Sequence, residues 1–368
     1  MSKPGNALAD YRLLPLALLL LLSCPLAGAA DKDCAASGEY AFVCGPKSAE
    51  DLVLVPDTKW IIASGFAEDA AIYLIDSQRK SWTELYPARA PRARQDMDVY
   101  GACPGSPDPN NLVTHGLSIR RGADGHSTLY VVGHGEREAI EVFDVDANGE
   151  MPVLTWTGCI LTPDSMEANS VASLGDGSLL VTIPLRTGIP ISDALAGKLT
   201  GGVYAWSPGD SGLTPVEGTE LPYANGIEVS ADGQEFYVVS SGLFTVTAYS
   251  NSNPARLLRR SKPLAIVPDN LHMASDGSLI TAGLSLLDPV CGAVPQSEEF
   301  DLAKFASCPR PFAVLTIDPQ SMLSRTLASG PANKHFSNIT MGLSVGGELW
   351  IGTFAGDRVA YRTLGQID

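Results

Sequence analysis

The chain has 368 residues, of which 45% are hydrophobic and 18% are charged, with 36 glycines and 26 prolines. This length can bury a large core, and the low charge content excludes a disordered chain. The formal net charge of -16 argues against nucleic acid or an acidic membrane surface as a partner, and is compatible with a divalent cation.

Residues 1–30 have the composition of a secretory signal peptide. Lys3 and Arg12 precede an apolar run at 13–22, which is too short to span a membrane, and a small-residue cleavage site follows at 27–29. We therefore expect a cleaved signal peptide over 1–30 and an exported mature chain over 31–368, periplasmic or secreted. A lipoprotein signal that ends at Cys24 is the alternative, and it would leave a lipid anchor there. No other stretch is long and apolar enough to be a transmembrane segment.

Six cysteines follow Cys24, and an even number in an oxidising compartment predicts up to three disulfides. Sequence alone leaves 15 pairings open. A preference for short loops favours Cys34–Cys44, Cys103–Cys159 and Cys291–Cys308. Metal binding by cysteine is disfavoured, because the chain has no C-x-x-C pair.

One pattern recurs six times along the chain. A polar residue leads an alternating apolar run, an Asp-Gly-like turn and a second apolar run, which is the composition of a β-hairpin. The leading residues are Glu50, His115, Asn169, Asn225, Asn270 and Asn338. Their spacing of roughly 45 to 68 residues is typical of propeller blades. The repeat predicts an all-β fold, a six-bladed β-propeller with four-stranded blades.

In a propeller, the leading residues of the inner strands would form a ring at one mouth of the central channel. Polar residues often begin strands, and Asn is a common turn residue, so one such position would carry no weight. Six together favour a site. Five side chains there offer hard oxygen ligands: Glu50, Asn169, Asn225, Asp269 and Asn270. Such a set suits Ca²⁺, which takes six to eight oxygens, better than zinc.

His115 leads the second repeat, and its hairpin predicts a partner. The turn of that hairpin is Asp124-Gly125, and antiparallel pairing around it places His134 beside His115. One histidine could then act as a general base on water while the other orients it. The alternative is two ordinary histidines at strand ends. The remaining histidines have no such pairing and receive no role: His126, His272 and His335.

At these residues the sequence resembles the paraoxonase/arylesterase family of calcium-dependent lactonases, from Glu50 to the last repeat. The most specific stretches are THGLS at 114–118, LYVVGH at 129–134 and IEVF at 140–143. The resemblance implies that the five oxygen ligands named above hold a catalytic calcium ion and that His115 and His134 form a histidine dyad. Gluconolactonases and strictosidine-synthase-like proteins share the propeller and part of this pattern, but not the histidine pair.

The sequence departs from that family at a second, structural calcium site. The family has an Asp directly after the first ligand Asn, where this chain has Ser170. Asp51 and the Leu117 carbonyl are the remaining candidates for a second ion, which the departure puts in doubt. The family's Asn-His-Pro-Asp run also reads Gly133 to Glu136 here.

We therefore expect a calcium-dependent hydrolase of lactones or aryl esters, in which a calcium-polarised carbonyl is attacked by water that histidine activates. Tyr223 and Phe66 are candidate walls of the substrate pocket. The alternatives are a gluconolactonase-like sugar-lactone hydrolase without a histidine base, and a non-catalytic exported propeller that binds a ligand. The sequence contains no nucleophile elbow, P-loop or dinucleotide-binding fingerprint.

Overall fold

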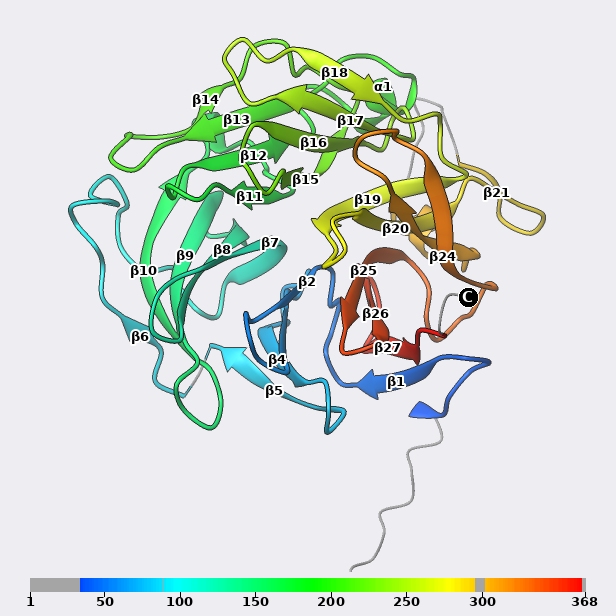
Figure 1. Cartoon of the computed structure of the whole chain (residues 1–368), viewed down its shortest axis with the longest axis horizontal. Coiled ribbons are helices and arrows are strands. Elements are labelled where there is room, and N and C mark those ends of the chain that lie inside the picture. The colour runs from blue at the N-terminus through cyan, green and yellow to red at the C-terminus, as the bar shows by residue number, and fades with distance from the viewer. Residues whose placement is uncertain (1–33, 88, 295–301, 366–368) are drawn as a thin grey trace, which may run out of the picture.

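The computed structural model describes residues 34–87, 89–294 and 302–365. Six antiparallel sheets stand around a central axis, with strands β2, β7, β11, β15, β19 and β25 innermost (Figure 1). This arrangement is a six-bladed β-propeller and confirms the predicted fold class. The expected signal peptide and the lipid-anchor alternative at Cys24 lie outside the described residues.

The first three blades follow one another along the chain, each from its inner strand outward. Blade 1 consists of β2 (Leu52–Leu54), β3 (Trp60–Ala63), β4 (Ile72–Asp76) and β5 (Ser81–Tyr86). Blade 2 consists of β7 (Leu112–Arg121), β8 (His126–Gly135), β9 (Ala139–Asp146) and β10 (Val153–Leu161), with β6 (Arg92–Ala93) parallel to β10 at the outer edge. Blade 3 consists of β11 (Val171–Ser173), β12 (Leu179–Ile183), β13 (Gly202–Trp206) and β14 (Thr214–Pro215).

The last three blades include an insertion and the closing strand. Blade 4 consists of β15 (Ala224–Val229), β16 (Glu235–Ser240), β17 (Thr245–Ser250) and β18 (Leu257–Arg260). Blade 5 consists of β19 (Ile266–Met273), β20 (Leu279–Ser285), β23 (Phe312–Ile317) and β24 (Ser324–Gly330). Blade 6 consists of β25 (Ile339–Val345), β26 (Glu348–Thr353), β27 (Arg358–Thr363) and β1 (Ala41–Cys44). Strand β1 therefore joins the first residues described to the last blade and closes the ring.

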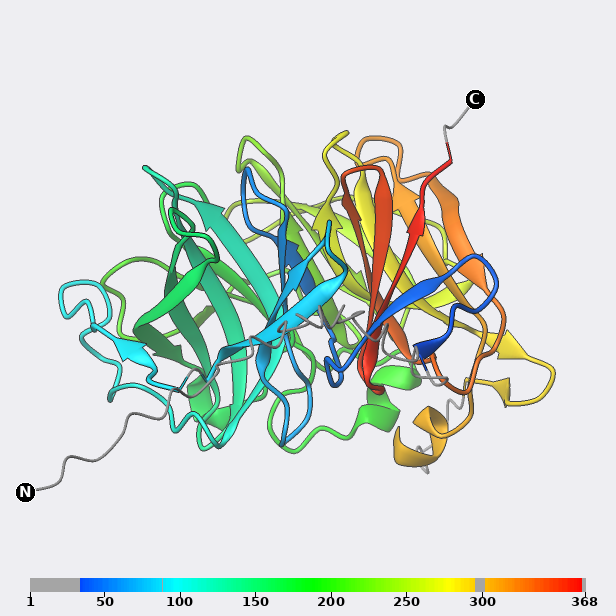
Figure 2. The same cartoon turned by 90° about the horizontal axis from the view of Figure 1, so that it is seen from below.

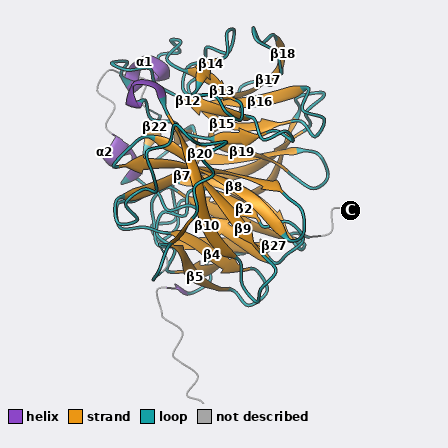
Figure 3. Cartoon of the chain, turned by 90° about the vertical axis from the view of Figure 1, so that its left-hand side faces the viewer, coloured by secondary structure: helices purple, strands orange, loops and turns teal. Residues whose placement is uncertain are grey.

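Short helices and the insertion lie in the loops. These elements are a 3₁₀ turn (Pro163–Ser165), α1 (Ile191–Leu195), β21 (Leu287–Asp288), β22 (Gly292–Ala293) and α2 (Leu302–Ala306). Helices α1 and α2 lie on the same side of the ring. Figure 2 shows the ring edge-on, and Figure 3 labels both helices. None of the helices in the described ranges is long and apolar enough to cross a membrane.

The core lies between neighbouring blades. Each sheet carries apolar side chains on both faces, because blades pack against each other face to face. Ile61 of blade 1 and Trp350 of blade 6 are fully buried in one such layer, and Leu117 and Phe143 of blade 2 are fully buried in the next. This packing holds the inner strands, and hence the ring of leading residues, in place.

The predicted hairpins are present, but the predicted register of the β7–β8 hairpin was wrong. Val113, rather than His115, pairs with His134, because a β-bulge between Thr114 and Leu117 shifts the register. Val113 and His115 are two residues apart and share a face of the strand, so His134 still reaches His115 diagonally.

Three disulfides join Cys34 to Cys44, Cys103 to Cys159 and Cys291 to Cys308. These are the pairs that the short-loop argument favoured, so that prediction is confirmed. Three disulfides are typical of proteins that fold in an oxidising compartment.

Candidate functional site

The leading residues of the six repeats lie on the inner strands or just before them, and nearly all are buried. Four lie at or just before the start of a strand, as predicted, but His115 lies inside β7 and Asn270 lies inside β19, because both strands begin earlier than the repeat indicated. Glu50 is 1% exposed and Asn270 is fully buried, while Asn169 and Asn225 are each 4% exposed. The His115 side chain is 12% exposed. Burial of this many polar side chains needs an explanation, because each loses its hydration.

Direct contacts join these residues into one cluster. The Asn270 amide donates to Glu50 Oε1 at 2.6 Å, and His115 Nε2 lies 3.8 Å from that same oxygen. Asp269 is hydrogen-bonded to the side chain of Asn225. The Gly116 amide donates to the Asn169 carbonyl at 3.1 Å, which holds Asn169 next to His115. The structure thus brings together all five predicted metal ligands and the predicted base.

Two glycines allow the inner strands to approach this closely. A Cβ atom on Gly116 would lie 2.5 Å from the Asn169 carbonyl oxygen, and one on Gly226 would lie 2.5 Å from the Leu271 nitrogen. Any side chain there would push neighbouring blades apart. The ring therefore requires glycine directly after His115 and directly after Asn225.

Four buried side-chain oxygens of the cluster have no hydrogen-bond partner among the described residues. These atoms are Glu50 Oε2, Asn169 Oδ1, Asn225 Oδ1 and Asn270 Oδ1. The amide nitrogens of Asn225 and Asn270 do have partners, since they donate to Ser241 Oγ and Glu50 Oε1. These bonds fix the orientation of both amides, and their oxygens remain without donors. A buried acceptor without a donor costs about 1–3 kcal/mol, so four of them call for a ligand. Hard oxygens from carboxylate and amide groups fit a calcium ion.

The two carboxylates of the cluster repel one another. Burial, together with the charges of Asp269 and Asp51, raises the pKa of Glu50 well above its ordinary value. Burial is also the main cause that raises the pKa of Asp269 to about 7, with Asp51 adding to it. Both shifts mean that the charged carboxylates are poorly compensated at this buried place, and a divalent cation would compensate them. Within the described ranges, no three or more His, Cys, Asp and Glu side chains are grouped so that they could hold a metal ion. The proposed ligand set differs from such a group, because three of its five members are asparagines.

The two histidines form a relay that ends on a carboxylate. His115 Nδ1 lies 3.2 Å from His134 Nε2, and His134 Nδ1 lies 2.6 Å from Glu138 Oε2. The carboxylate requires a proton on His134 Nδ1, so His134 Nε2 accepts the proton of His115 Nδ1. His115 Nε2 is then the unprotonated nitrogen, and it faces the metal cluster. Burial, with His134 adding to it, lowers the pKa of His115 well below its ordinary value and keeps the ring neutral.

The predicted pocket walls lie at this same place. The Phe66 ring stacks on His115 with centroids 4.2 Å apart, and its centroid is 6.0 Å from that of His134. Tyr223 is half-buried and precedes β15 with a left-handed φ of 52°. Burial and the charges of Asp269, Glu167 and Glu50 raise the pKa of its phenol, so Tyr223 faces the carboxylate cluster as a neutral group.

Asp51 and Leu117, the candidates for a second ion, are in contact with each other. Asp51 Oδ2 accepts the Leu117 amide at 2.8 Å, and Oδ1 accepts the Leu52 amide at 2.8 Å and lies 2.9 Å from His272 Nε2. Burial alone would lower the pKa of His272, but Asp51 and Glu228 outweigh it and raise the pKa to about 10. Sequence reasoning assigned His272 nothing, although its place two residues after Asn270 on one strand was the available signal.

Asn338, the sixth leading residue, contacts the insertion of blade 5. Its amide donates to the Ala306 carbonyl at the end of α2 at 3.0 Å, and its φ of 58° is left-handed. Asn338 therefore holds α2 against the face that carries the site. Glu138 was also missed, because nothing in the repeat singles it out.

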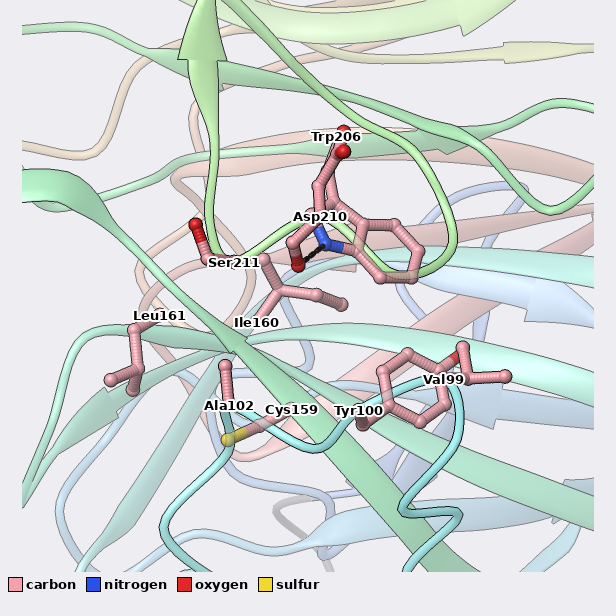
Figure 4. Close-up of a pocket in the computed structure, with 9 residues that line it drawn as sticks. All are labelled: Val99, Tyr100, Ala102, Cys159, Ile160, Leu161, Trp206, Asp210 and Ser211. Carbon is pink, nitrogen blue, oxygen red and sulfur yellow. Dashed lines mark hydrogen bonds between the residues drawn. The ribbon is translucent and has the colours of Figure 1, made fainter.

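A second cavity lies between blades 2 and 3, away from the ring. Figure 4 shows it next to Tyr100 and Trp206, whose rings stack with centroids 5.5 Å apart. The Trp206 indole donates to the Asp210 carbonyl at 2.9 Å. The cavity measures about 10 Å³, which is room for one water molecule, so it is no substrate site.

Comparisons with known proteins identify the fold. No protein-family model matches the sequence, and no curated protein does. Among solved structures, a gluconolactonase from Xanthomonas campestris matches with a TM-score of 0.53 at 16% identity, and the match covers 89% of both chains. A calcium-binding protein, regucalcin, from Agrobacterium tumefaciens matches with a TM-score of 0.50 at 10% identity, over 89% of this chain and 94% of that one. A luciferin-regenerating enzyme matches with a TM-score of 0.52 at 13% identity, over 88% and 94%. At these identities the likeness shows a shared propeller.

Proposed function

We propose that this chain is an exported, calcium-dependent hydrolase of lactones or related esters, of the paraoxonase-like kind. One observation carries the proposal: four buried oxygens of the cluster have no donor among the described residues, and His115 Nε2 lies 3.8 Å from the Glu50 carboxylate of the same cluster. The three disulfides support export. The gluconolactonase and calcium-binding neighbours support a lactone substrate and a calcium ion.

The metal would be held by Glu50, Asn169, Asn225, Asp269 and Asn270. When bound, the ion supplies a Lewis acid that polarises the substrate carbonyl. His115 Nε2 takes a proton from water, and the resulting hydroxide adds to the carbonyl carbon. The ester C–O bond then breaks, and the leaving alkoxide takes that proton back from His115.

His134 and Glu138 stabilise the protonated state of His115. As His115 Nε2 gains a proton, the proton on its Nδ1 is shared with His134 Nε2, and the Glu138 carboxylate compensates the positive charge. Phe66 stacks on His115 and fixes the plane of its ring. Phe66 and Tyr223 would form the walls against which the substrate packs.

A hydrolysis panel tests the proposal. The purified protein is assayed on acyl-homoserine lactones, simple aliphatic lactones, gluconolactone and phenyl acetate, with calcium and with a chelator. We expect turnover that the chelator abolishes and that His115→Gln lowers by about 10²–10⁴-fold. His126→Gln is the matched control, since His126 pairs with Asp144 at the surface. Turnover that survives both the chelator and His115→Gln would contradict the proposal.

The same panel separates the two other candidate functions. A gluconolactonase-like enzyme, which the structural neighbours favour, would act on gluconolactone and be indifferent to His134→Gln. A ligand-binding propeller without catalysis would show a calcium-dependent melting temperature and no turnover on any member of the panel.

A further inference from the structure

His272 lies in the channel between two carboxylates that come from other blades. Its Nε2 is 2.9 Å from Asp51 Oδ1 of blade 1, and its Nδ1 is 3.5 Å from Glu228 Oε2 of blade 4. The Asp51 side chain is fully buried, and that of His272 is 12% exposed. Each ring nitrogen thus faces a carboxylate oxygen, and the imidazole ring lies between the two acids.

The carboxylates around His272 differ from the ring oxygens in having donors. Both oxygens of Asp51 accept backbone amides, those of Leu52 and Leu117. Both oxygens of Glu228 do the same, with the Val229 amide at 2.8 Å and the Met273 amide at 3.0 Å. Asp51 Oδ1 accepts the Leu52 amide and also contacts His272, so both of its lone pairs are used, and each of the other three oxygens has one lone pair occupied by an amide.

The Asp51 side chain is fully buried and that of Glu228 is 19% exposed, so both carboxylates need polar partners within the fold. We infer that the His272 side chain is the partner that bridges Asp51 and Glu228, so the interior of the channel holds a histidine side chain where a second metal ion would otherwise sit. The chain then binds one calcium ion, at the ring. The presence of the ion at the ring rests on the proposed function, whereas the absence of a second ion rests on His272 alone.

The same pair positions the site. Asp51 directly follows Glu50, its Oδ2 holds the Leu117 amide two residues beyond His115, and His272 lies two residues beyond Asn270. The Asp51–His272 pair therefore ties together β2, β7 and β19, which carry or closely follow three of the proposed ligands and the base. His272 is a positioning residue that touches no reacting atom.

Metal content tests the inference without measuring activity. The protein is stripped with a chelator, dialysed to equilibrium against calcium, and analysed for calcium per chain. We expect one ion per chain. Two ions would overturn the inference and leave the proposed function standing. No ion would overturn the calcium centre of the proposed function, and the role of His272 would then be decided by the variants.

Three variants separate charge from shape, with melting temperatures measured in chelator. We expect His272→Asn to melt roughly 5–10 °C below the wild type, because it leaves Asp51 Oδ1 without its side-chain partner, and His272→Lys to recover much of that loss, because lysine can bridge the same two acids. His126→Asn, at an exposed histidine, is expected to melt with the wild type. A His272→Asn protein as stable as the wild type, or a His272→Lys protein no better than His272→Asn, would overturn the inference. If His272→Asn does not fold, a folded His272→Lys supports it, and failure of both overturns it.

Discussion

Glu50 and Asp51 are adjacent in the sequence and equally buried, yet their surroundings are opposite. Glu50 faces the ring and has an oxygen without a partner among the described residues, whereas both oxygens of Asp51 accept N–H groups. The two adjacent side chains point to different neighbours, Glu50 to Asn270 and His115 of the ring and Asp51 to Leu117 and His272. Burial of an acid therefore does not by itself favour a metal site. The proposal at the ring depends on four donor-free oxygens that belong to one cluster.

The largest effect is expected at the mouth, from the proposed base. His115→Gln keeps a side chain of similar size but loses the nitrogen that takes the proton, so we expect kcat to fall by about 10³-fold. Calcium binding and the melting temperature should stay near wild-type values, because His115 is not a proposed ligand. Isothermal titration with calcium, beside the rate measurement, checks both halves. A parallel loss of calcium binding would mean that the histidine is part of the metal site instead.

The two adjacent acids provide a matched pair of variants. Glu50→Gln removes one charged ligand, and we expect calcium to bind about 10²-fold more weakly while the metal-free protein keeps its melting temperature. Asp51→Asn should do the reverse: it leaves His272 with Glu228 alone and lowers the melting temperature in chelator by roughly 5–10 °C. Calcium titration and thermal melting of both variants give a two-by-two comparison. Equal effects of the two variants on calcium affinity would erase the distinction between mouth and interior.

A smaller effect is expected from Glu138, which reaches the ring only through His134. Glu138→Gln leaves a hydrogen-bond acceptor for His134 Nδ1 but no charge, so we expect kcat to fall by about 10-fold with little change in KM. Glu136→Gln is a suitable control, because Glu136 lies in the same loop and contacts the Asp108 amide. A Glu138 variant with full turnover would show that the relay ends at His134.

Much of this site could be predicted from the sequence, because its residues hold fixed places in a repeat. Each hairpin has period-two apolar runs around a turn, so equivalent residues of the six inner strands were expected to meet around the channel. The β7–β8 register could not be predicted, since a bulge at His115 and Gly116 depends on the neighbouring blade.

Contacts outside the repeat were also beyond prediction. Strand β1 joins blade 6 although its sequence lies before the first repeat. His272 contacts Asp51, which is 221 residues away in the sequence. Neither Asp51 nor Glu228, the two carboxylates that it contacts, lies on its own strand. These contacts arise from closure of the ring, which leaves only blade 6 between blade 5 and blade 1, and no local pattern records that.

The smallest expected effect is a pH dependence that exists only without metal. The folded pKa of Asp269 is about 7, above its ordinary value of 3.8, so the folded state binds a proton that the unfolded state has lost. Asp269 therefore contributes stability at low pH that disappears as the pH rises through 7. From pH 8 to pH 6 in chelator, we expect the melting temperature of the wild type to rise by roughly 2–4 °C relative to Asp269→Asn. Saturating calcium should abolish this difference, because the ion keeps the carboxylate charged. A difference that persists in calcium would place Asp269 outside the metal cluster and assign its shift to the interior of the channel.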